Sequence, residues 1–474
     1  MNAAARPEAG RPAAGPDSGE ARPAAAKPSP EILRLQNGPI LSTLLKLAVP
    51  SVLAMVMQVL VGIAETVYVG RLGTTPLAAM ALVFPFLMLA QQLSAGAMGG
   101  GVSSAVARAL GASNLERANT LALHALAIGG LLGTVFTLVM LTLGPTFYRL
   151  LGGQGAVLEE AIGYSGVLFF GALFVWLSNT LASVLRGTGN MRVPSLGILG
   201  ASVLQIVLGG VLALGAGPVP SLGMPGVAIA YIVANGASVA FFAWYLASGN
   251  SRLTLRLRGL RLQREMFFDI LKVGAVSMLS PLQSVLTVLI FTGFVARLGV
   301  EPLAGYSIGQ RLEFLLIPIS FGIGVASVPM VGMAMGAGNV ARARKVAWTA
   351  GVVSAFNLGV IGLTVAVFPD LWAALFTSDA GVLGYAREYL RIAGPAFAFF
   401  GLGLTLYFAS QGSGKMIGPV LAGTVRLAVV FGAGTWLVSL PGTSAHLFGL
   451  VAASMVVYGL ATVAAVRLTR WGKG

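Results

Sequence analysis

Long apolar stretches separated by short polar breaks dominate this chain and limit the folds that it can adopt. A helix crosses a bilayer with about 20 predominantly apolar residues, and the 474-residue sequence contains about twelve such stretches. The sequence therefore predicts an all-α integral membrane protein with twelve transmembrane helices. Their approximate ranges are 44–70, 77–100, 119–143, 160–185, 194–215, 225–247, 270–296, 303–327, 346–368, 386–410, 418–439 and 446–467.

The composition excludes several classes of protein. Hydrophobic residues make up 56% of the chain and charged residues only 9%, whereas a soluble globular protein has about 25% charged residues. A soluble enzyme and a nucleic-acid-binding module are therefore excluded, despite the net charge of +15. A receptor with a single membrane anchor is excluded because no sizeable polar domain remains. The chain has no cysteine, so disulfides and thiol chemistry are absent.

The first 36 residues differ from the rest in being rich in Ala, Pro, Gly and Arg. They contain too few apolar residues to offset the entropy of ordering, so we expect residues 1–36 to form a disordered cytoplasmic tail. The segment also lacks the apolar core of a secretory signal.

The positive charges predict the orientation in the membrane. Cytoplasmic loops of membrane proteins are enriched in Lys and Arg, and an N-terminus in the cytoplasm gives the inner side most of these residues. We therefore expect both termini in the cytoplasm, a basic cytoplasmic linker at 248–269, and location in a bacterial inner (plasma) membrane. The inner set is Arg108, Arg117, Arg186, Arg192, Arg252, Arg256, Arg258, Arg261, Arg264, Arg342, Arg344, Lys345, Lys415, Arg467, Arg470 and Lys473. The outer set is Arg71, Arg149, Arg297, Arg387 and Arg391.

The two halves of the sequence repeat each other. Residues 45–80 and 271–306 align without a gap and share 14 of 36 positions. Two further matches pair residues 109–118 with 334–343, and residues 186–194 with 411–419. The offsets of these three matches are 226, 225 and 225, so shared apolar composition alone does not explain them.

Each repeat contains six helices, and an even number keeps its orientation in the membrane. We therefore expect two parallel six-helix repeats, an N lobe at 37–247 and a C lobe at 270–474, around a central cavity. Such an arrangement can expose the cavity on either side of the membrane in turn.

Several polar and glycine motifs give the sequence a family resemblance. The chain resembles the multidrug and toxic compound extrusion (MATE) family of cation-coupled exporters over about residues 40–468. The motifs are Leu47-Ala-Val-Pro50, Glu65-Thr-Val-Tyr-Val-Gly-Arg-Leu-Gly73, Leu77-Ala-Ala, Gly111-Ala-Ser-Asn-Leu-Glu-Arg-Ala118, Arg186-Gly-Thr-Gly-Asn-Met-Arg-Val-Pro194 and Leu222-Gly-Met-Pro-Gly-Val-Ala-Ile-Ala230.

The resemblance transfers the ion-binding acids of the family only in part. The acid of the first helix falls on Glu65. The Asn-x-x-x-Asp pair of one branch of the family falls on Gln205 and Gly209, and two acids of another branch fall near Ser284 and Phe400. This departure leaves the coupling ion open between H⁺ and Na⁺. A single carboxylate without clear oxygen partners suits a proton better than Na⁺, which needs several oxygen ligands. We therefore expect H⁺ as the coupling ion, and no cofactor or metal.

Two acids fall well within apolar stretches, Glu65 and Glu313. A lone carboxylate at that depth costs about 3 kcal/mol, so it is usually protonated, paired or functional. Glu65 shares a helix face with Gln58 and Gly62 and is our candidate coupling-ion site, or alternatively an interfacial partner of Arg71. Glu313 is the candidate for a second ion or cationic-substrate site, or for a structural salt bridge.

Polar residues inside the apolar stretches are candidates for the wall of the substrate cavity, or for hydrogen bonds between helices. We also expect Arg426 to lie near the inner surface and to extend toward it. The cavity candidates are Gln58, Gln92, Trp176, Asn179, Gln205, Gln283, Tyr306, Gln310 and Tyr407.

The glycine-rich segments predict packing and helix ends. Gly99–Gly101 lack the Gly-Lys-Ser/Thr of a phosphate loop, so close helix packing is the better interpretation. Gly187, Gly189, Gly412 and Gly414 are placed to end helices before the next proline.

These features predict a secondary active multidrug efflux transporter that exchanges small amphipathic or cationic organic compounds for H⁺ or Na⁺. The alternative is a flippase for lipid-linked precursors, which would carry several cationic residues in its cavity. An intramembrane enzyme is not expected, because the apolar stretches hold no recognisable catalytic motif. The expected partners are small-molecule substrates and membrane lipids, with no nucleic acid, and the chain is expected to be a monomer.

Overall fold

The computed structural model describes residues 30–254, 262–439 and 444–472, and these ranges are almost entirely helical. Within them, eleven helices are long and apolar enough to cross a membrane. A further pair, joined at Gly171 with a bend of 42°, forms a twelfth span when its two helices are counted together. The all-α fold with twelve spans is thereby confirmed.

The first half of the chain forms the N lobe. It contains a π-helical segment, η1, that continues α3 into α4. The elements are α1 (Pro30–Asn37), α2 (Ile40–Leu72), α3 (Thr74–Gln91), η1 (Gln92–Met98), α4 (Gly99–Gly111), α5 (Leu115–Leu150), α6 (Gly155–Phe170), α7 (Ala172–Gly187), α8 (Arg192–Leu214) and α9 (Met224–Ala247).

The second half forms the C lobe, whose first span is broken between α10 and α11. The elements are α10 (Arg264–Ser277), α11 (Leu279–Ala296), α12 (Val300–Gly336), α13 (Val340–Val367), α14 (Asp370–Ala373), α15 (Ala380–Ala393), the 3₁₀ turn η2 (Gly394–Ala396), α16 (Phe397–Ser413), α17 (Ile417–Ser439) and α18 (Ser444–Leu468).

Several helices extend beyond the apolar stretches that predicted them. The second span continues through α4 to Gly111, and α12 continues to Gly336. The extension in α4 is rich in Gly, Ala and Ser, and the extension in α12 contains Pro329, Gly332 and Gly336, so both interrupt the apolar signal and resemble a loop in the sequence. In the structure most of these small residues are buried, because they let helix backbones approach closely.

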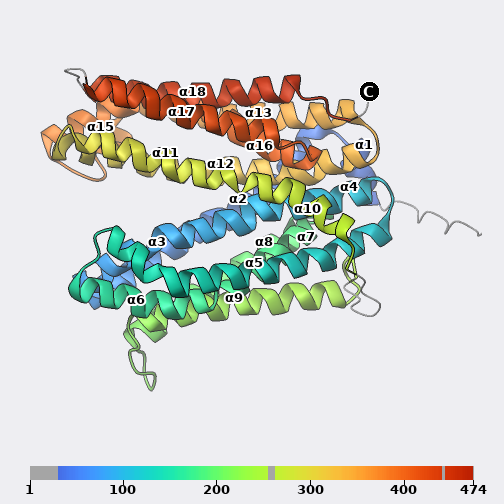
Figure 1. Ribbon diagram of the computed structural model, residues 1–474, viewed down its shortest axis with the longest axis horizontal. Helices are drawn as coiled ribbons and strands as arrows, with labels where there is room; N and C mark the ends of the chain where they lie inside the picture. Colours follow the sequence, from blue (N-terminus) through green and yellow to red (C-terminus); the bar gives the residue numbers. More distant parts are fainter. Residues whose placement is uncertain (1–29, 255–261, 440–443, 473–474) are drawn as a thin grey trace, which may run out of the picture.

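The two lobes lie side by side and meet at one end, which we call the closed end (Figure 1). There α4 of the N lobe packs against α10, α12 and α16 of the C lobe. A Cβ atom at Gly101 would overlap Gly274 of α10, and one at Gly111 would overlap Met333 of α12. Both α1 and the C-terminal end of the chain also lie at the closed end, and the lobes diverge toward the opposite end (Figure 1).

The glycine predictions are confirmed in detail. A Cβ atom at Gly100 would overlap the side chain of Gln411, so the glycine cluster serves close packing between the lobes. Helix α7 ends at Gly187, and α16 ends one residue before Gly414, which has a left-handed φ of 77°. Glycine adopts this conformation without the strain that a Cβ atom would add.

The expected tail and linker differ from the structure where it describes them, since residues 264–269 of the expected linker belong to α10. Residues 30–37 form helix α1, whereas we expected disorder up to residue 36. Leu35 is buried against Gly189, and Arg342 donates hydrogen bonds to the carbonyl oxygens of Leu35 and Gly38. The sequence alone does not reveal this docking, because one buried leucine in a polar segment carries little apolar signal. Residues 1–29 and 255–261 lie outside the described ranges.

Candidate functional site

The candidate ion site of the N lobe is built around the carboxylate of Glu65 on α2. This side chain is only 5% exposed, and Nε2 of Gln205 on α8 donates a hydrogen bond to it at 2.6 Å. One turn further along α2, the hydroxyl of Tyr68 donates to the carbonyl oxygen of Ile206 at 3.0 Å. These two bonds fix α2 against α8 and hold the acid inside the lobe.

The geometry decides between the two interpretations of Glu65. The described residues form no ion pair between Glu65 and Arg71, which lies six positions further along the same helix. Glu65 lies seven residues before the end of α2, or about 10 Å at about 1.5 Å per residue. The acid is therefore a buried group of the lobe interior with an amide partner, and not an interfacial acid paired with arginine.

A second polar cluster joins four helical elements of the N lobe. The side chain of Asn179 on α7 donates to Gln91 of α3 at 3.0 Å and to Ser94 of η1 at 2.8 Å. Gln91 in turn donates to the hydroxyl of Tyr231 on α9 at 3.1 Å. Trp176 is buried one turn before Asn179, with a ring nitrogen that has no hydrogen-bond partner among the described residues. The N lobe therefore holds a polar interior in addition to Glu65.

The polar interior of this lobe could be predicted only in part from the sequence. Among the predicted cavity residues, Gln205, Asn179 and Trp176 are buried, whereas Gln58 and Gln92 are exposed. No hydrogen bond from the side chains of Gln58 and Gln92 is present in the described part of the chain. Adjacent residues point to different faces of a helix, so the sequence could not decide which member of the Gln91–Gln92 pair faces inward. It also missed Ser94, Tyr68 and Tyr231.

The second candidate acid lies in the C lobe and is partly buried. Glu313 of α12 accepts a hydrogen bond from the hydroxyl of Tyr389 on α15. The ring of Tyr389 meets that of Tyr306 edge to face at 5.4 Å between centroids. Gln310 donates to the hydroxyl of Tyr306 at 3.2 Å. The predicted stripe of Tyr306, Gln310 and Glu313 therefore forms one polar group, with Tyr389 as a partner that the sequence did not indicate.

Arg426 of α17 lies in the interior of the C lobe, which corrects the expectation that it extends toward the inner surface. Its guanidinium carbon lies 5.6 Å from the ring centre of Phe400 and 5.7 Å from that of Tyr458. Its Nε lies 3.5 Å from the hydroxyl of Ser454. The two aromatic faces stabilise the cation where it is, so no extension to the membrane surface is needed.

The remaining two cavity candidates connect helices. Gln283 of α11 donates to the hydroxyl of Thr424 on α17 at 2.9 Å. The hydroxyl of Tyr407 on α16 donates to the carbonyl oxygen of Ser277 at 3.0 Å and accepts a hydrogen bond from Gln411. Gln283 therefore holds α11 against α17, and Tyr407 holds α16 against the end of α10.

Charged residues that we interpreted only as a topology signal form a cluster across the lobes at the closed end. Arg117 of α5 pairs with Glu265 at 2.9 Å and with Asp269 at 2.7 Å, both on α10. Arg108 of α4 lies 3.6 Å from Asp269, and Lys272 also pairs with this acid. Asp269 is thus surrounded by three cations, two of them from the other lobe. We call these five residues the closed-end ion cluster.

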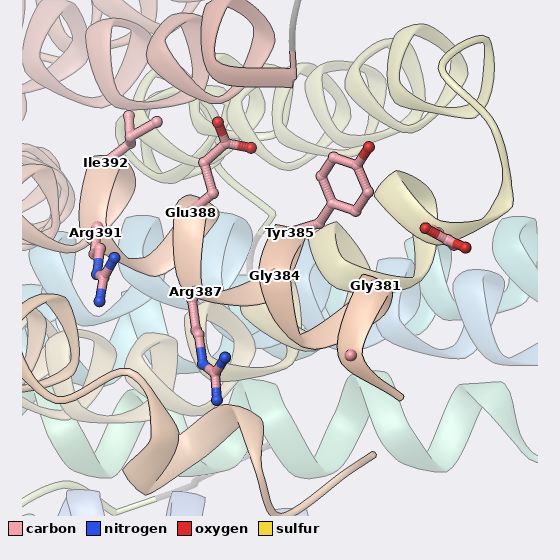
Figure 2. A pocket seen from close by; sticks show the side chains of 9 residues that line it. Gly381, Gly384, Tyr385, Arg387, Glu388, Arg391 and Ile392 are labelled. Carbon is pink, nitrogen blue, oxygen red and sulfur yellow. The ribbon is translucent and has the colours of Figure 1, made fainter. Parts of the chain in front are cut away.

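A surface hollow lies in the C lobe, at the end opposite to the closed-end ion cluster. It has a volume of about 650 Å³ and is lined by Glu301 and residues of α15. Figure 2 shows Arg387 and Arg391 pointing to one side of α15 and Glu388 and Tyr385 to the other. Arg387 pairs with Asp370, and Glu388 accepts a hydrogen bond from Ser444, so two of the four charged residues that line the hollow have protein partners. Among the described residues, no group of three or more acids or histidines could hold a metal ion.

Comparison with known proteins identifies the family. The sequence profile of the MatE family matches residues 50–211 and 277–434, one segment in each lobe. These two segments cover more than half of the chain, and they follow the two repeats.

Characterised relatives of similar length are transporters. The chain is 24% identical to the multidrug export protein MepA of Staphylococcus aureus over 408 residues, which cover 85% of this chain and 89% of the relative. It is 25% identical to an FAD transporter of Shewanella oneidensis over 392 residues, which cover 79% of this chain and 82% of the relative.

Solved structures of the same fold support the assignment. One is described as an outward-facing conformation of a multidrug resistance MATE family transporter of the MOP superfamily, with a TM-score of 0.84 and 26% identity. Another is a MOP superfamily transporter from Pyrococcus furiosus, with a TM-score of 0.85 and 26% identity. Each comparison covers 93% of this chain and 98% of the other. The chain is therefore a multi-pass membrane transporter and belongs to the MatE family, the multidrug and toxic compound extrusion transporters.

Proposed function

We propose that this transporter is a secondary active exporter, which moves small amphipathic organic compounds out of the cytoplasm in exchange for protons. The names of the relatives support export of diverse compounds, since one is a multidrug export protein. The cycle alternates between states in which the lobes separate at one end or at the other. The protein needs no cofactor and works as a monomer within the lipid bilayer.

The orientation that we propose places the closed end in the cytoplasm of a bacterial cell. Helix α1 and the C-terminal end of the chain lie at this end, together with many of the basic residues. Positive residues are enriched on the cytoplasmic side of membrane proteins. The structure then corresponds to an outward-facing state, in keeping with the outward-facing relative of similar fold.

The observation that carries the proposed coupling is the burial of Glu65 with a single hydrogen-bond partner, Gln205, among the described residues. A glutamine amide has both a donor and an acceptor. It can donate to the ionised carboxylate and, after rotation, accept from the protonated acid. Gln205 can therefore partner Glu65 in both protonation states, as a proton-coupled site requires.

The same partner argues against sodium as the coupling ion. Hard cations are bound by several oxygen ligands at once. Among the described residues, the side-chain hydrogen bond to the Glu65 carboxylate comes from a single amide, that of Gln205. Even after rotation, this amide adds only one oxygen to those of the carboxylate. The donor set around Glu65 thus favours H⁺ over Na⁺.

The substrate class follows from the relatives and the polar interior. We propose amphipathic compounds, including cationic ones, because each lobe contains an acid with aromatic neighbours, buried in the N lobe and partly buried in the C lobe. A flippase for lipid-linked precursors remains the alternative. It is less favoured because Arg311 lies over the ring of Phe376 and Arg426 lies between two rings, so both cations are already engaged.

The test of this proposal is the driving force in a reconstituted system. The purified chain in proteoliposomes is given a pH gradient or a sodium gradient of equal size, and movement of a fluorescent cationic dye such as rhodamine 6G is followed. We expect transport with the pH gradient and none with the sodium gradient. Transport driven only by sodium contradicts proton coupling, and absence of transport with either gradient contradicts the exporter assignment.

A further inference from the structure

The most unusual charged residue outside the sites described above is Arg186, near the C-terminal end of α7. Its side chain is only 4% exposed. The described part of the chain offers it no hydrogen bond and no ion pair. Arginine stays protonated in proteins, so this is a buried cation without a protein partner. Such a charge destabilises the state that buries it, and it calls for a specific reason.

Arg186 lines a small cavity at the junction of the lobes. Helices α2 and α8 of the N lobe line this cavity, and Phe321 and Val325 of α12 close it from the C lobe. Its volume is about 10 Å³, which is room for about one water molecule. Besides Arg186, the polar lining consists of Ser51 and Ser195. One wall therefore belongs to the lobe that must move when the closed end opens.

The internal repeat supplies a comparison for this position. Arg186 and Gln411 are equivalent residues of the two repeats, at the offset of 225. Gln411 crosses the junction and donates a hydrogen bond from Nε2 to the carbonyl oxygen of Gly96 at 3.0 Å. The same motif thus places a neutral, hydrogen-bonded side chain in one lobe and a charged side chain without a partner in the other. The fold does not require an arginine there.

Separation of the lobes changes the surroundings of Arg186. When α12 moves away from α2 and α8, the cavity opens toward the cytoplasmic side of the proposed cycle. Arg186 then lies on the wall of an enlarged, wet space beside two serine hydroxyls. A guanidinium presents paired N–H donors that match a carboxylate or a phosphate.

We propose that Arg186 binds the anionic group of acidic or zwitterionic substrates, a carboxylate or a phosphate, when the transporter is open to the cytoplasm. This inference rests on the proposed export function. The site exists only in that state, because the closed cavity excludes any organic ion. The transporter would thereby bind acidic compounds on the cytoplasmic side. Their contact with Arg186 would break as the lobes close.

The test uses pairs of compounds that differ only in the acidic group. Rhodamine 110 is the free carboxylic acid of rhodamine 123, and riboflavin 5′-phosphate adds a phosphate to riboflavin. Transport driven by a pH gradient is measured in inside-out membrane vesicles, in which the proposed cytoplasmic end faces the bath. The ratio of apparent KM values within each pair is compared between wild type and Arg186→Gln.

The substitution is chosen because the other repeat carries glutamine at this position, so folding is expected to survive. We expect Arg186→Gln to raise the KM of the acid relative to its partner without the acidic group by about ten-fold or more, with Arg186→Lys in between. The carboxylate and phosphate pairs show which group the site prefers. Arg192→Gln removes an exposed arginine six residues further on and should keep the wild-type ratio.

The outcomes separate this inference from the proposed function. Two results overturn the proposed anion site: an unchanged KM ratio in Arg186→Gln, or no transport of either acid by wild type. Neither result contradicts the proposed export of dyes. Equal loss of both members of a pair shows a structural role and also overturns it. Absence of pH-driven transport of every compound contradicts the proposed function itself.

Discussion

At the scale of single residues, the protein keeps polar side chains inside its lobes by giving each a specific partner. Glu65 has Gln205, Glu313 has Tyr389, and Arg426 has two aromatic rings. Burying a polar or charged group without such partners would cost several kcal/mol in an apolar interior. These partners therefore determine whether an acid can change its protonation during transport without destabilising the lobe.

Replacement of Gln205 by leucine tests the partner of Glu65. A hydrogen bond to a charged group contributes about 1.5–3 kcal/mol, which corresponds to a factor of about ten to one hundred. We expect Gln205→Leu to lower the rate of proton-driven transport at least about ten-fold, measured in proteoliposomes with the amount of folded protein checked by gel filtration.

The matched control is Gln283→Leu in the other lobe. Gln283 also joins two helices through its amide, but its partner is the hydroxyl of Thr424 and not an acid. Its transport rate should stay within about two-fold of wild type. Equal losses in the two variants would show that Gln205 acts only as a link between helices.

At the scale of elements, the closed end is held by contacts that cross between lobes. The small residues of α4 let α10, α12 and α16 approach, and the closed-end ion cluster connects α4 and α5 to α10. Helix α1 contacts both lobes, because Leu35 packs on Gly189 while Arg342 of α13 binds its last carbonyl groups. Opening at this end has to break these contacts, so they set the balance between the two states.

Asp269→Asn tests the ion cluster. The carboxylate is 15% exposed and meets three cations, so its loss should shift the balance by about 1–2 kcal/mol, or about five- to thirty-fold. Because the chain has no cysteine, a single cysteine can be placed at Ser104, a buried residue of α4 that contacts α16 across the lobes. Its rate of reaction with a maleimide reports opening of the closed end. We expect faster labelling in Asp269→Asn by at least about five-fold.

Glu265→Gln serves as the control for the same cluster. The side chain of Glu265 is 70% exposed, and exposed ion pairs contribute little. Labelling at position 104 should therefore stay near the wild-type rate. If both variants label at the wild-type rate, the cluster does not hold the closed end together.

Helix α1 gives a test of its own. Leu35 is 4% exposed, whereas Leu33 on the same helix is 42% exposed. Removing a buried leucine side chain costs about 2 kcal/mol or more, so Leu35→Ala should lower the midpoint of thermal unfolding in detergent while Leu33→Ala should not. The same midpoint for wild type and both variants would mean that α1 is not docked as described.

At the scale of the whole molecule, two repeats of six helices form lobes of the same fold with different chemistry. The N lobe carries Glu65 where the C lobe has Phe291, and the N lobe has Arg186 where the C lobe has Gln411. Some charged positions are kept in both repeats, such as Arg71 and Arg297, whereas Glu65 and Arg186 occur in one lobe only. The two lobes can therefore move against each other as similar bodies and still bind different ions or substrates.

The sequence predicted much of this architecture because apolar length and repeat offsets do not depend on tertiary contacts. Each of the twelve predicted stretches falls, to within about one residue, in a helix or helix pair. The pairing of Glu65 with Gln205 could not be predicted, because 140 positions separate them. The location of Arg426 was predicted wrongly, and the closed-end ion cluster was not predicted. The reason is the same, because a sequence gives the position of a charged residue but not its partner.

The central claim is that Glu65 carries the coupled proton, and its most direct test is pH-gradient-driven transport by reconstituted Glu65→Gln. Glutamine keeps the size and hydrogen bonding of the neutral acid but cannot release a proton. We expect this variant to fold and insert normally and to lose gradient-driven transport. Glu65→Asp should retain part of this transport. Glu313→Gln tests the acid of the C lobe in parallel. Transport by well-folded Glu65→Gln at the wild-type rate would contradict the claim and direct attention to Glu313.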